Sequence, residues 1–144
     1  MNSNVTAVRY FSKTGNTEKL AAEIAKTTGD KALTLEYPVQ DKIDILFLGA
    51  SVYWGGIDEK VKEFIRNLDA KLVGSVAVFS TSALAERAYP DMKKLLNARG
   101  IKTTNENFYC RGQFKIMHRN RPDEADLKAA REFALSLKYG KVRI

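Results

Sequence analysis

Ser12-Lys13-Thr14-Gly15-Asn16-Thr17 is the stretch that decides the fold of this chain. It follows an apolar run, residues 5–11, which predicts a buried strand, and it precedes residues 18–28, which have the periodicity of an amphipathic helix. The N–H groups at the start of a helix have no partner within the helix, and the helix dipole makes that end positive. A turn with three hydroxyls and a glycine at this position therefore predicts a phosphate-binding site.

An ordinary helix N-cap is the simpler interpretation of the same turn, since Ser, Thr and Asn are all favoured caps. One cap needs one such residue, whereas five of the six residues here are cap-type or glycine, so we favour an anion site. The turn is neither a Walker loop, which ends in Gly-Lys-Ser/Thr, nor the dinucleotide fingerprint, which needs two further glycines.

Five apolar runs alternate with helical patterns along the chain, which predicts an α/β fold with parallel strands. The runs are residues 5–11, 32–35, 43–50, 76–79 and about 101–110. The later helices are expected over residues 57–68, over residues 90–98 and from Pro122 onward.

The hydroxyl-rich turn after a first strand resembles the phosphate-binding signature of the flavodoxin family, in which this turn holds the phosphate of FMN. The resemblance covers essentially the whole chain and is strongest at residues 12–17 and 49–68. It implies a single flavodoxin-like domain over residues 1–144, with a doubly wound five-stranded parallel sheet of order 2-1-3-4-5 and helices on both faces.

A second informative stretch, residues 49–57, leaves the third predicted strand and enters the next helix. In the order 2-1-3-4-5 the strand order reverses between the first and third strands, so this loop and the turn at 12–17 would face each other. Tyr53 and Trp54 can stack on a flat heterocycle, and the stretch resembles the flavin-stacking loop of flavodoxins. Packing of Trp54 on its own domain is the alternative.

The loop at residues 80–85 follows the fourth predicted strand and should form a third wall of the site. It has no aromatic residue at its start, so the later Tyr89 is a weak candidate for the second face of the flavin. The residues that the resemblance assigns to FMN are Ser12, Lys13, Thr14, Gly15, Asn16, Thr17, Ser51, Val52, Tyr53, Trp54, Gly55, Gly56, Thr81, Ser82, Ala83, Tyr89 and Gly112.

No catalytic residue or metal ligand is predicted. Cys110 is the single cysteine and His118 the single histidine, and neither has partners at a spacing typical of a metal site or a nucleophilic triad. The single cysteine, with no long apolar run and no signal-like start, predicts a cytoplasmic protein without membrane insertion. We also expect a monomer.

The formal net charge is +7, which predicts partners with an acidic surface. The late basic residues could form a docking patch; they are Lys115, Arg119, Arg121, Lys138, Lys141 and Arg143. Nucleic acid is not expected as a partner because the chain contains no nucleic-acid-binding motif.

The resemblance implies an FMN-binding electron-transfer protein that carries one or two electrons between redox partners. An FMN-dependent reductase or oxidase that acts on a quinone, a porphyrin precursor or a similar flat substrate is the alternative. A binding module that has lost the flavin is a third hypothesis.

Overall fold

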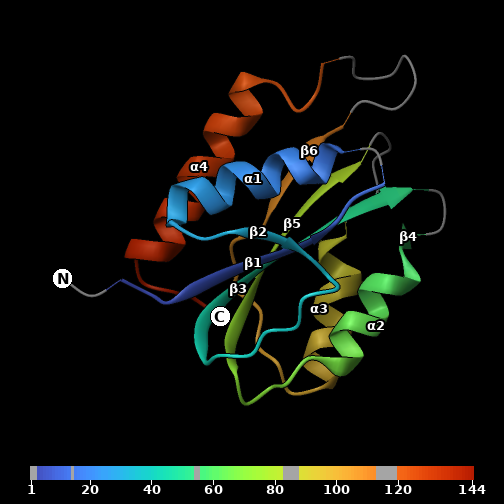
Figure 1. The fold of residues 1–144 in the computed structure, drawn as a ribbon, viewed down its shortest axis with the longest axis vertical. Helices are drawn as coiled ribbons and strands as arrows, with labels where there is room; N and C mark the ends of the chain where they lie inside the picture. Colours follow the sequence, from blue (N-terminus) through green and yellow to red (C-terminus); the bar gives the residue numbers. More distant parts are fainter. Residues whose placement is uncertain (1–2, 14, 54–55, 83–87, 113–119) are drawn as a thin grey trace.

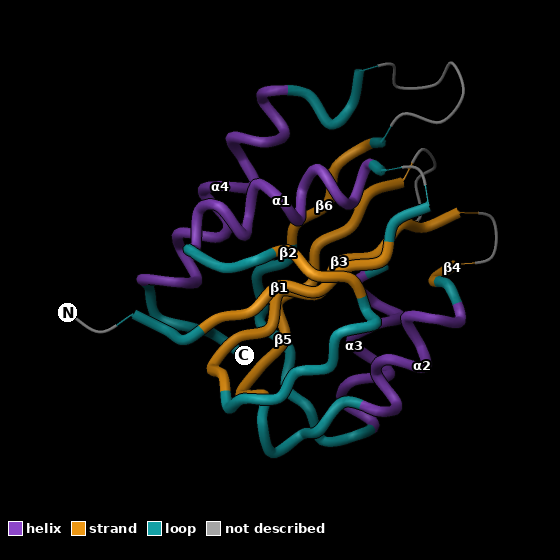
Figure 2. The backbone as a smooth tube through the Cα atoms, viewed as in Figure 1, coloured by secondary structure: helices purple, strands orange, loops and turns teal. Residues whose placement is uncertain are grey.

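Five parallel strands form the centre of the fold, and helices cover both faces of the sheet (Figures 1 and 2). The computed structural model describes residues 3–13, 15–53, 56–82, 88–112 and 120–144. The strands are β1 (Thr6–Phe11), β2 (Ala32–Thr34), β3 (Ile43–Tyr53), β4 (Gly56–Ile57), β5 (Val73–Ser82) and β6 (Phe108–Arg111). The helices are α1 (Asn16–Thr28), α2 (Glu59–Asn67), α3 (Tyr89–Ala98) and α4 (Glu124–Tyr139).

The sheet has the order β2-β1-β3-β5-β6, and each of these neighbouring pairs is parallel. This confirms the predicted order 2-1-3-4-5, in which the fourth and fifth strands are β5 and β6. The short strand β4 was not predicted. It pairs antiparallel with the end of β3 and places Ile57 opposite Val52. Ile57 therefore lies in a hairpin, and α2 begins two residues later than the sequence pattern indicated.

A separate hydrophobic cluster lies on each face of the sheet. Figures 1 and 2 show the helices that cover the two faces. Leu46 and Leu48 of β3 pack in the cluster that contains α2 and α3. Ile45 and Phe47 pack in the cluster that contains α1 and α4. Successive side chains of a strand point to opposite faces, and both faces are covered here, which explains why β3 is apolar along most of its length.

β3 and β5 extend further than the sequence analysis predicted. Residues 51–53 and 80–82 were interpreted as loops, but they continue the two strands, and Ser51 pairs in register with Thr81. Serine and threonine are typical of loops because a buried hydroxyl without a partner is costly. In this fold the hydroxyls at the strand ends find partners, and the strands continue with polar side chains inside the structure.

The fifth predicted strand is shorter than expected, since β6 begins only at Phe108. Thr103 makes a single bridge to Val76 of β5. The Thr104 hydroxyl then donates a hydrogen bond to the Glu106 carbonyl at 2.7 Å, so the chain turns locally before the strand starts. A polar segment that satisfies its own backbone in this way does not need to pair with the sheet.

We expect Gly49→Ala to destabilise the fold. Gly49 lies opposite Phe79 in the β3–β5 register, and a Cβ atom at residue 49 would lie 2.3 Å from the Phe79 ring. Overpacking of this kind in a buried sheet should lower the free energy of unfolding by about 1–3 kcal/mol, measured by urea denaturation. Phe79→Leu removes the clashing ring, so the double variant should lose less than the sum of the two single variants. Strict additivity would contradict this account.

Candidate functional site

Thr17, in the first turn of α1, connects this helix to the ends of two strands. Its hydroxyl is 2.7 Å from the Ser51 hydroxyl of β3 and 2.8 Å from the Thr81 hydroxyl of β5, and all three side chains are buried. The turn at residues 12–17 and the carboxyl ends of β3 and β5 therefore meet, as the sequence analysis predicted. Three hydroxyls carry three protons and these two bonds use two of them, which leaves one proton for a further acceptor.

The start of α1 differs from the starts of α2 and α4. Its N-cap is Gly15, with φ of 88°, and glycine has no side chain to accept from the first-turn N–H groups. The N-caps of α2 and α4 are Asp58 and Asp123, and each carboxylate accepts a hydrogen bond from a first-turn N–H. The Ser12 hydroxyl accepts from the Gly15 N–H at 2.9 Å, ahead of the helix. α3 likewise begins without a side-chain cap, at Ala88, and what sets α1 apart is the hydroxyl-bearing turn before it.

Gly112 brings the end of β6 to the same place. Its N–H donates to the Ser82 carbonyl of β5 at 3.2 Å. A Cβ atom on residue 112 would lie 2.7 Å from the Asn16 side-chain nitrogen, so only glycine permits this approach without a shift. The start of α1 therefore contacts the carboxyl-terminal edge of the sheet at β3, at β5 and just beyond β6.

Lys13 connects the turn to α2. Its ammonium lies 3.4 Å from the Asp58 carboxylate, which also accepts the Lys60 N–H at 2.9 Å as the N-cap of α2. The Lys60 N–H, and after it Lys13, hold the pKa of Asp58 below its usual value, although partial burial opposes them. The sequence analysis missed Asp58 as a member of this site. An Asp directly before an amphipathic run is an N-cap signal that could have found it.

Two of the predicted cofactor residues have side chains that pack away from this edge of the sheet. Val52 pairs with Ser82 at the end of β3, so its backbone lies at the edge, but its side chain is 2% exposed and packs in the cluster with α2 and α3. The Tyr89 hydroxyl donates to the Thr104 carbonyl, and Thr104 pairs with Val76, about 20 Å along β5 from Ser82. This placement argues against Tyr89 as the second face of a flavin at the strand ends.

Gly56 of β4 pairs with Tyr53 of β3 in the short hairpin at the end of β3. In the sheet, β3 is the neighbour of β1, the strand that the turn at residues 12–17 follows. The predicted residues Thr14, Trp54, Gly55 and Ala83 lie outside the described residues, as do Lys115, Arg119 and His118. Their roles remain predictions from the sequence.

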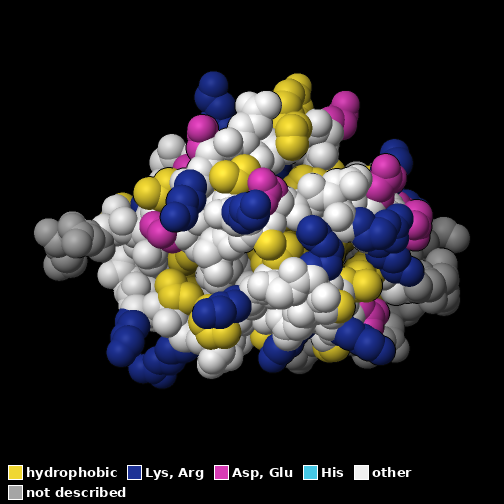
Figure 3. Space-filling model, turned by 90° about the horizontal axis from the view of Figure 1, so that it is seen from below, with side chains coloured by type: hydrophobic (Ala, Val, Ile, Leu, Met, Phe, Trp, Pro, Cys, Tyr) yellow, Lys and Arg dark blue, Asp and Glu magenta, His cyan; other side chains and the backbone are white. Residues whose placement is uncertain are grey.

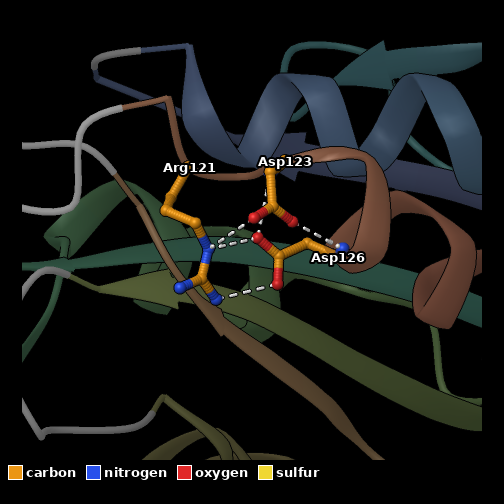
Figure 4. Close-up of polar contacts among 3 residues, drawn as sticks. All are labelled: Arg121, Asp123 and Asp126. Atoms are coloured by element: carbon orange, nitrogen blue, oxygen red, sulfur yellow. Dashed lines mark hydrogen bonds and ion pairs between the residues drawn. The ribbon is translucent and has the colours of Figure 1, made fainter.

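Arg121 and two carboxylates hold the start of α4 (Figure 4). Its guanidinium makes two hydrogen bonds to Asp126, at 2.5 and 2.8 Å, and lies 3.7 Å from Asp123. Asp123 and Asp126 also form a capping box, each accepting the backbone N–H of the other. The helix therefore begins at Glu124, whereas the sequence analysis placed Pro122 and Asp123 inside it. Burial raises the pKa of Asp126, but Arg121 and the Asp123 N–H lower it more.

Two of the late basic residues that the sequence analysis grouped as a possible docking patch, Arg121 and Lys138, lie at opposite ends of α4. The charge of Arg121 is matched by two carboxylates at one end of α4. Lys138 lies at the other end of the helix, about 24 Å away, where its ammonium donates to the Thr6 hydroxyl at the start of β1. In the face drawn in Figure 3, Lys and Arg side chains are distributed over the surface, with Asp and Glu between them.

Cys110 lies in β6 with 6% of its surface exposed. Burial raises the pKa of its thiol to about 12, so the nucleophilic thiolate is not formed at neutral pH. Within the described ranges, the structure contains no group of His, Cys, Asp and Glu side chains that could hold a metal ion. None of the described helices combines the length and the apolar character that crossing a membrane requires.

Comparison with known proteins gives one consistent result. The model of the family described as a flavodoxin domain matches residues 7–120. The structure of a flavodoxin from the domain Archaea has a TM-score of 0.76 over 92% of this chain and 94% of its own, at 13% identity. A short-chain flavodoxin associated with a bacterial PDU microcompartment has a TM-score of 0.70 over 92% and 96%, at 21% identity. An uncharacterized protein of Methanocaldococcus jannaschii is 27% identical over 85% of this chain and 89% of its own.

We expect Thr17→Val to lower the free energy of unfolding by about 1–3 kcal/mol, because it leaves the Ser51 and Thr81 hydroxyls without their shared partner. Thr27→Val on the same helix is the matched control, since the Thr27 hydroxyl bonds only to the Glu23 carbonyl one turn earlier. Urea denaturation of both variants measures the difference. Equal losses at the two positions would show that the buried hydroxyl contacts do not hold α1 to the sheet.

Proposed function

The chain belongs to the flavodoxin domain family, and we propose that it binds FMN and carries electrons between redox partners. The observation that supports this proposal is the meeting of the glycine-capped start of α1 with the hydroxyl-bearing ends of β3 and β5. A phosphate group fits there because it accepts hydrogen bonds from helix N–H groups and hydroxyls and is favoured by the helix dipole.

The residues of this chain fit the cofactor by their chemistry. Ser12, Thr14 and Asn16 would hold the phosphate together with the first N–H groups of α1. The hairpin of β3 and β4, with Tyr53 and Trp54, would hold the ring, and Gly112 would permit a close backbone approach. Bound FMN supplies the transfer of one or two electrons, and the protein supplies binding, orientation and electrostatics.

The charges around the turn indicate how an anion would be attracted. Lys13 is the positive side chain of the turn, and its charge is partly matched by Asp58 at 3.4 Å. In this proposal, phosphate is therefore attracted mainly by N–H and hydroxyl donors and by the dipole of α1. The charge of Lys13 contributes less, because Asp58 partly offsets it.

We predict that Ser12→Ala and Thr14→Ala each weaken FMN binding about tenfold, since a hydrogen bond to a charged group contributes roughly 1.5–3 kcal/mol. Riboflavin lacks the phosphate, so its affinity should hardly change. Thr17 is left intact because its hydroxyl holds the strand ends together. Thr27→Ala, at the other end of α1, is the matched control. Equal losses for FMN and riboflavin would argue against a phosphate site at this turn.

Trp54 is the only tryptophan, so its fluorescence reports the same titration. Stacking on a flavin should quench its emission strongly as FMN binds. An unquenched signal at saturating FMN would leave the alternative interpretation, in which Trp54 packs on its own domain. A protein that stays colourless with FMN would instead favour the module that has lost its flavin.

We propose a carrier over an FMN-dependent reductase because the likeness to flavodoxins extends over nearly the whole chain and over nearly the whole of those proteins. We also propose a cytoplasmic location, because a single cysteine suits a reducing compartment, and partners with an acidic surface, on the net charge of +7.

The FMN-loaded protein should not turn over NAD(P)H or a quinone by itself, and its rate of electron transfer to an acidic redox protein should fall as salt rises. Stopped-flow absorbance across ionic strength measures the second point. Steady turnover of a quinone or NAD(P)H by the purified protein would favour the reductase. A transfer rate that does not change with salt, or that rises with it, would contradict the proposal of an acidic partner.

A further inference from the structure

The Asp58 carboxylate makes a different contact with each of its two oxygens. Oδ1 accepts the Lys60 N–H at 2.9 Å and so caps α2. Oδ2 lies 3.4 Å from the ammonium of Lys13, which belongs to the turn at residues 12–17. The hydrogen bond from the Lys60 N–H lowers the pKa of Asp58, so the carboxylate is ionised at neutral pH. A negative charge therefore lies beside the turn.

Capping of α2 does not require this charge. An N-cap needs a side-chain oxygen that accepts a first-turn N–H, and Asn and Ser provide one as well as Asp does. The helix dipole favours a carboxylate at this end of α2, but Glu59 in the first turn also supplies one. The pairing with Lys13 is therefore the contact of Asp58 that needs a carboxylate.

The pair lies between the two parts of the chain that we assign to the cofactor. Lys13 is in the turn proposed to hold the phosphate, and Asp58 directly follows β4, the second strand of the hairpin proposed to hold the ring. α2 contacts this region a second time, since the Lys60 ammonium lies 5.7 Å from the ring centroid of Phe11, the residue before the turn. The first turn of α2 thus places a carboxylate and an ammonium next to the start of the proposed site.

The pair contributes more to the charge at the turn than to its stability. The Lys13 side chain is 54% exposed and that of Asp58 is 23% exposed. Ion pairs with this much contact with water add little to the free energy of unfolding, because water and salt weaken the attraction. A charge nonetheless acts on an anion within roughly 10 Å of it, the distance over which salt screens charges in water. What the carboxylate changes is therefore the net charge that an anion meets at the turn.

We propose that Asp58 limits the affinity of this turn for a phosphate monoester, because its charge offsets the charge of Lys13. The turn then selects the phosphate by N–H and hydroxyl donors, which require a fitting geometry, and binding depends little on salt. Without the Asp58 charge, Lys13 would add an attraction for any anion. The inference rests on the proposed FMN site, and it gives Asp58 a role that acts through Lys13 and not through a contact with the ligand.

Asp58→Asn tests the proposal, because Asn keeps the cap and removes the charge. Titration of the full chain with FMN and with riboflavin, followed by flavin fluorescence, measures both affinities at several KCl concentrations. FMN affinity should rise by about threefold to tenfold at low salt, and the gain should shrink as KCl rises. Lys13→Gln should lower FMN affinity by a similar factor, and the double variant should bind FMN about as the wild type does. Riboflavin affinity should hardly change in any variant, because riboflavin has no phosphate.

Asp69→Asn is the matched control. Asp69 follows the other end of α2, where its carboxylate accepts the Lys71 N–H at 2.9 Å, and it makes no ion pair with any residue that the structure describes. The two Asp→Asn variants change the net charge of the chain equally, and each keeps an oxygen for its backbone N–H. Asp69→Asn should leave FMN affinity unchanged. An equal gain in both variants would show an effect of net charge alone and would overturn the proposal.

Three further results would also overturn it. If Asp58→Asn and Lys13→Gln weakened FMN and riboflavin binding to the same extent, the pair would only hold the turn in place. If Asp58→Asn bound FMN as the wild type does at every KCl concentration, while Ser12→Ala still lost FMN affinity, Asp58 would have no such role and the FMN site itself would stand. A wild-type chain that bound no FMN would overturn the proposed function together with this inference. Circular dichroism checks that each variant is folded.

Discussion

The Thr17 hydroxyl holds the first turn of α1 against the ends of β3 and β5, and the geometry of the site depends on this contact. The three side chains are almost inaccessible to water, so a hydroxyl that lost its partner could not be compensated by solvent. A shift of α1 along the sheet would therefore break one or both of these hydrogen bonds and lower the stability of the fold. Three small polar groups from three separate elements locate the turn at residues 12–17 relative to the sheet.

The same turn makes two further contacts at this edge, and each reaches a different element. Lys13 pairs with Asp58, the N-cap of α2, and Asn16 lies against Gly112 just after β6. Gly112 in turn bonds to the Ser82 carbonyl of β5. Residues 12–17 thus contact elements on both faces of the sheet, and the start of α1 is positioned by its neighbours rather than by a capping side chain of its own.

The apolar runs were sufficient to predict parallel strands joined by helices, because central parallel strands must be apolar along their length. The order of the sheet and the helices on both faces came from the resemblance to the flavodoxin family. The apolar runs did not predict where the strands end. Ser51 and the run Ser80-Thr81-Ser82 have the composition of loops, and their place in β3 and β5 becomes understandable only when their hydroxyl partners are known. Partners such as Ser51 and Thr81 are distant in the sequence, so local pattern cannot show that the cost of burial is offset. The hydroxyl-rich turn itself could be recognised because its residues are contiguous.

Charge was the least predictable property, since a net value of +7 says nothing about where the charges are paired. Lys13 and Arg121 each lie beside carboxylates, and Arg9 is buried against backbone carbonyls. Because Coulomb energy falls with distance and is screened by salt, each site responds to the charges within roughly 10 Å of it and not to the sum over the chain.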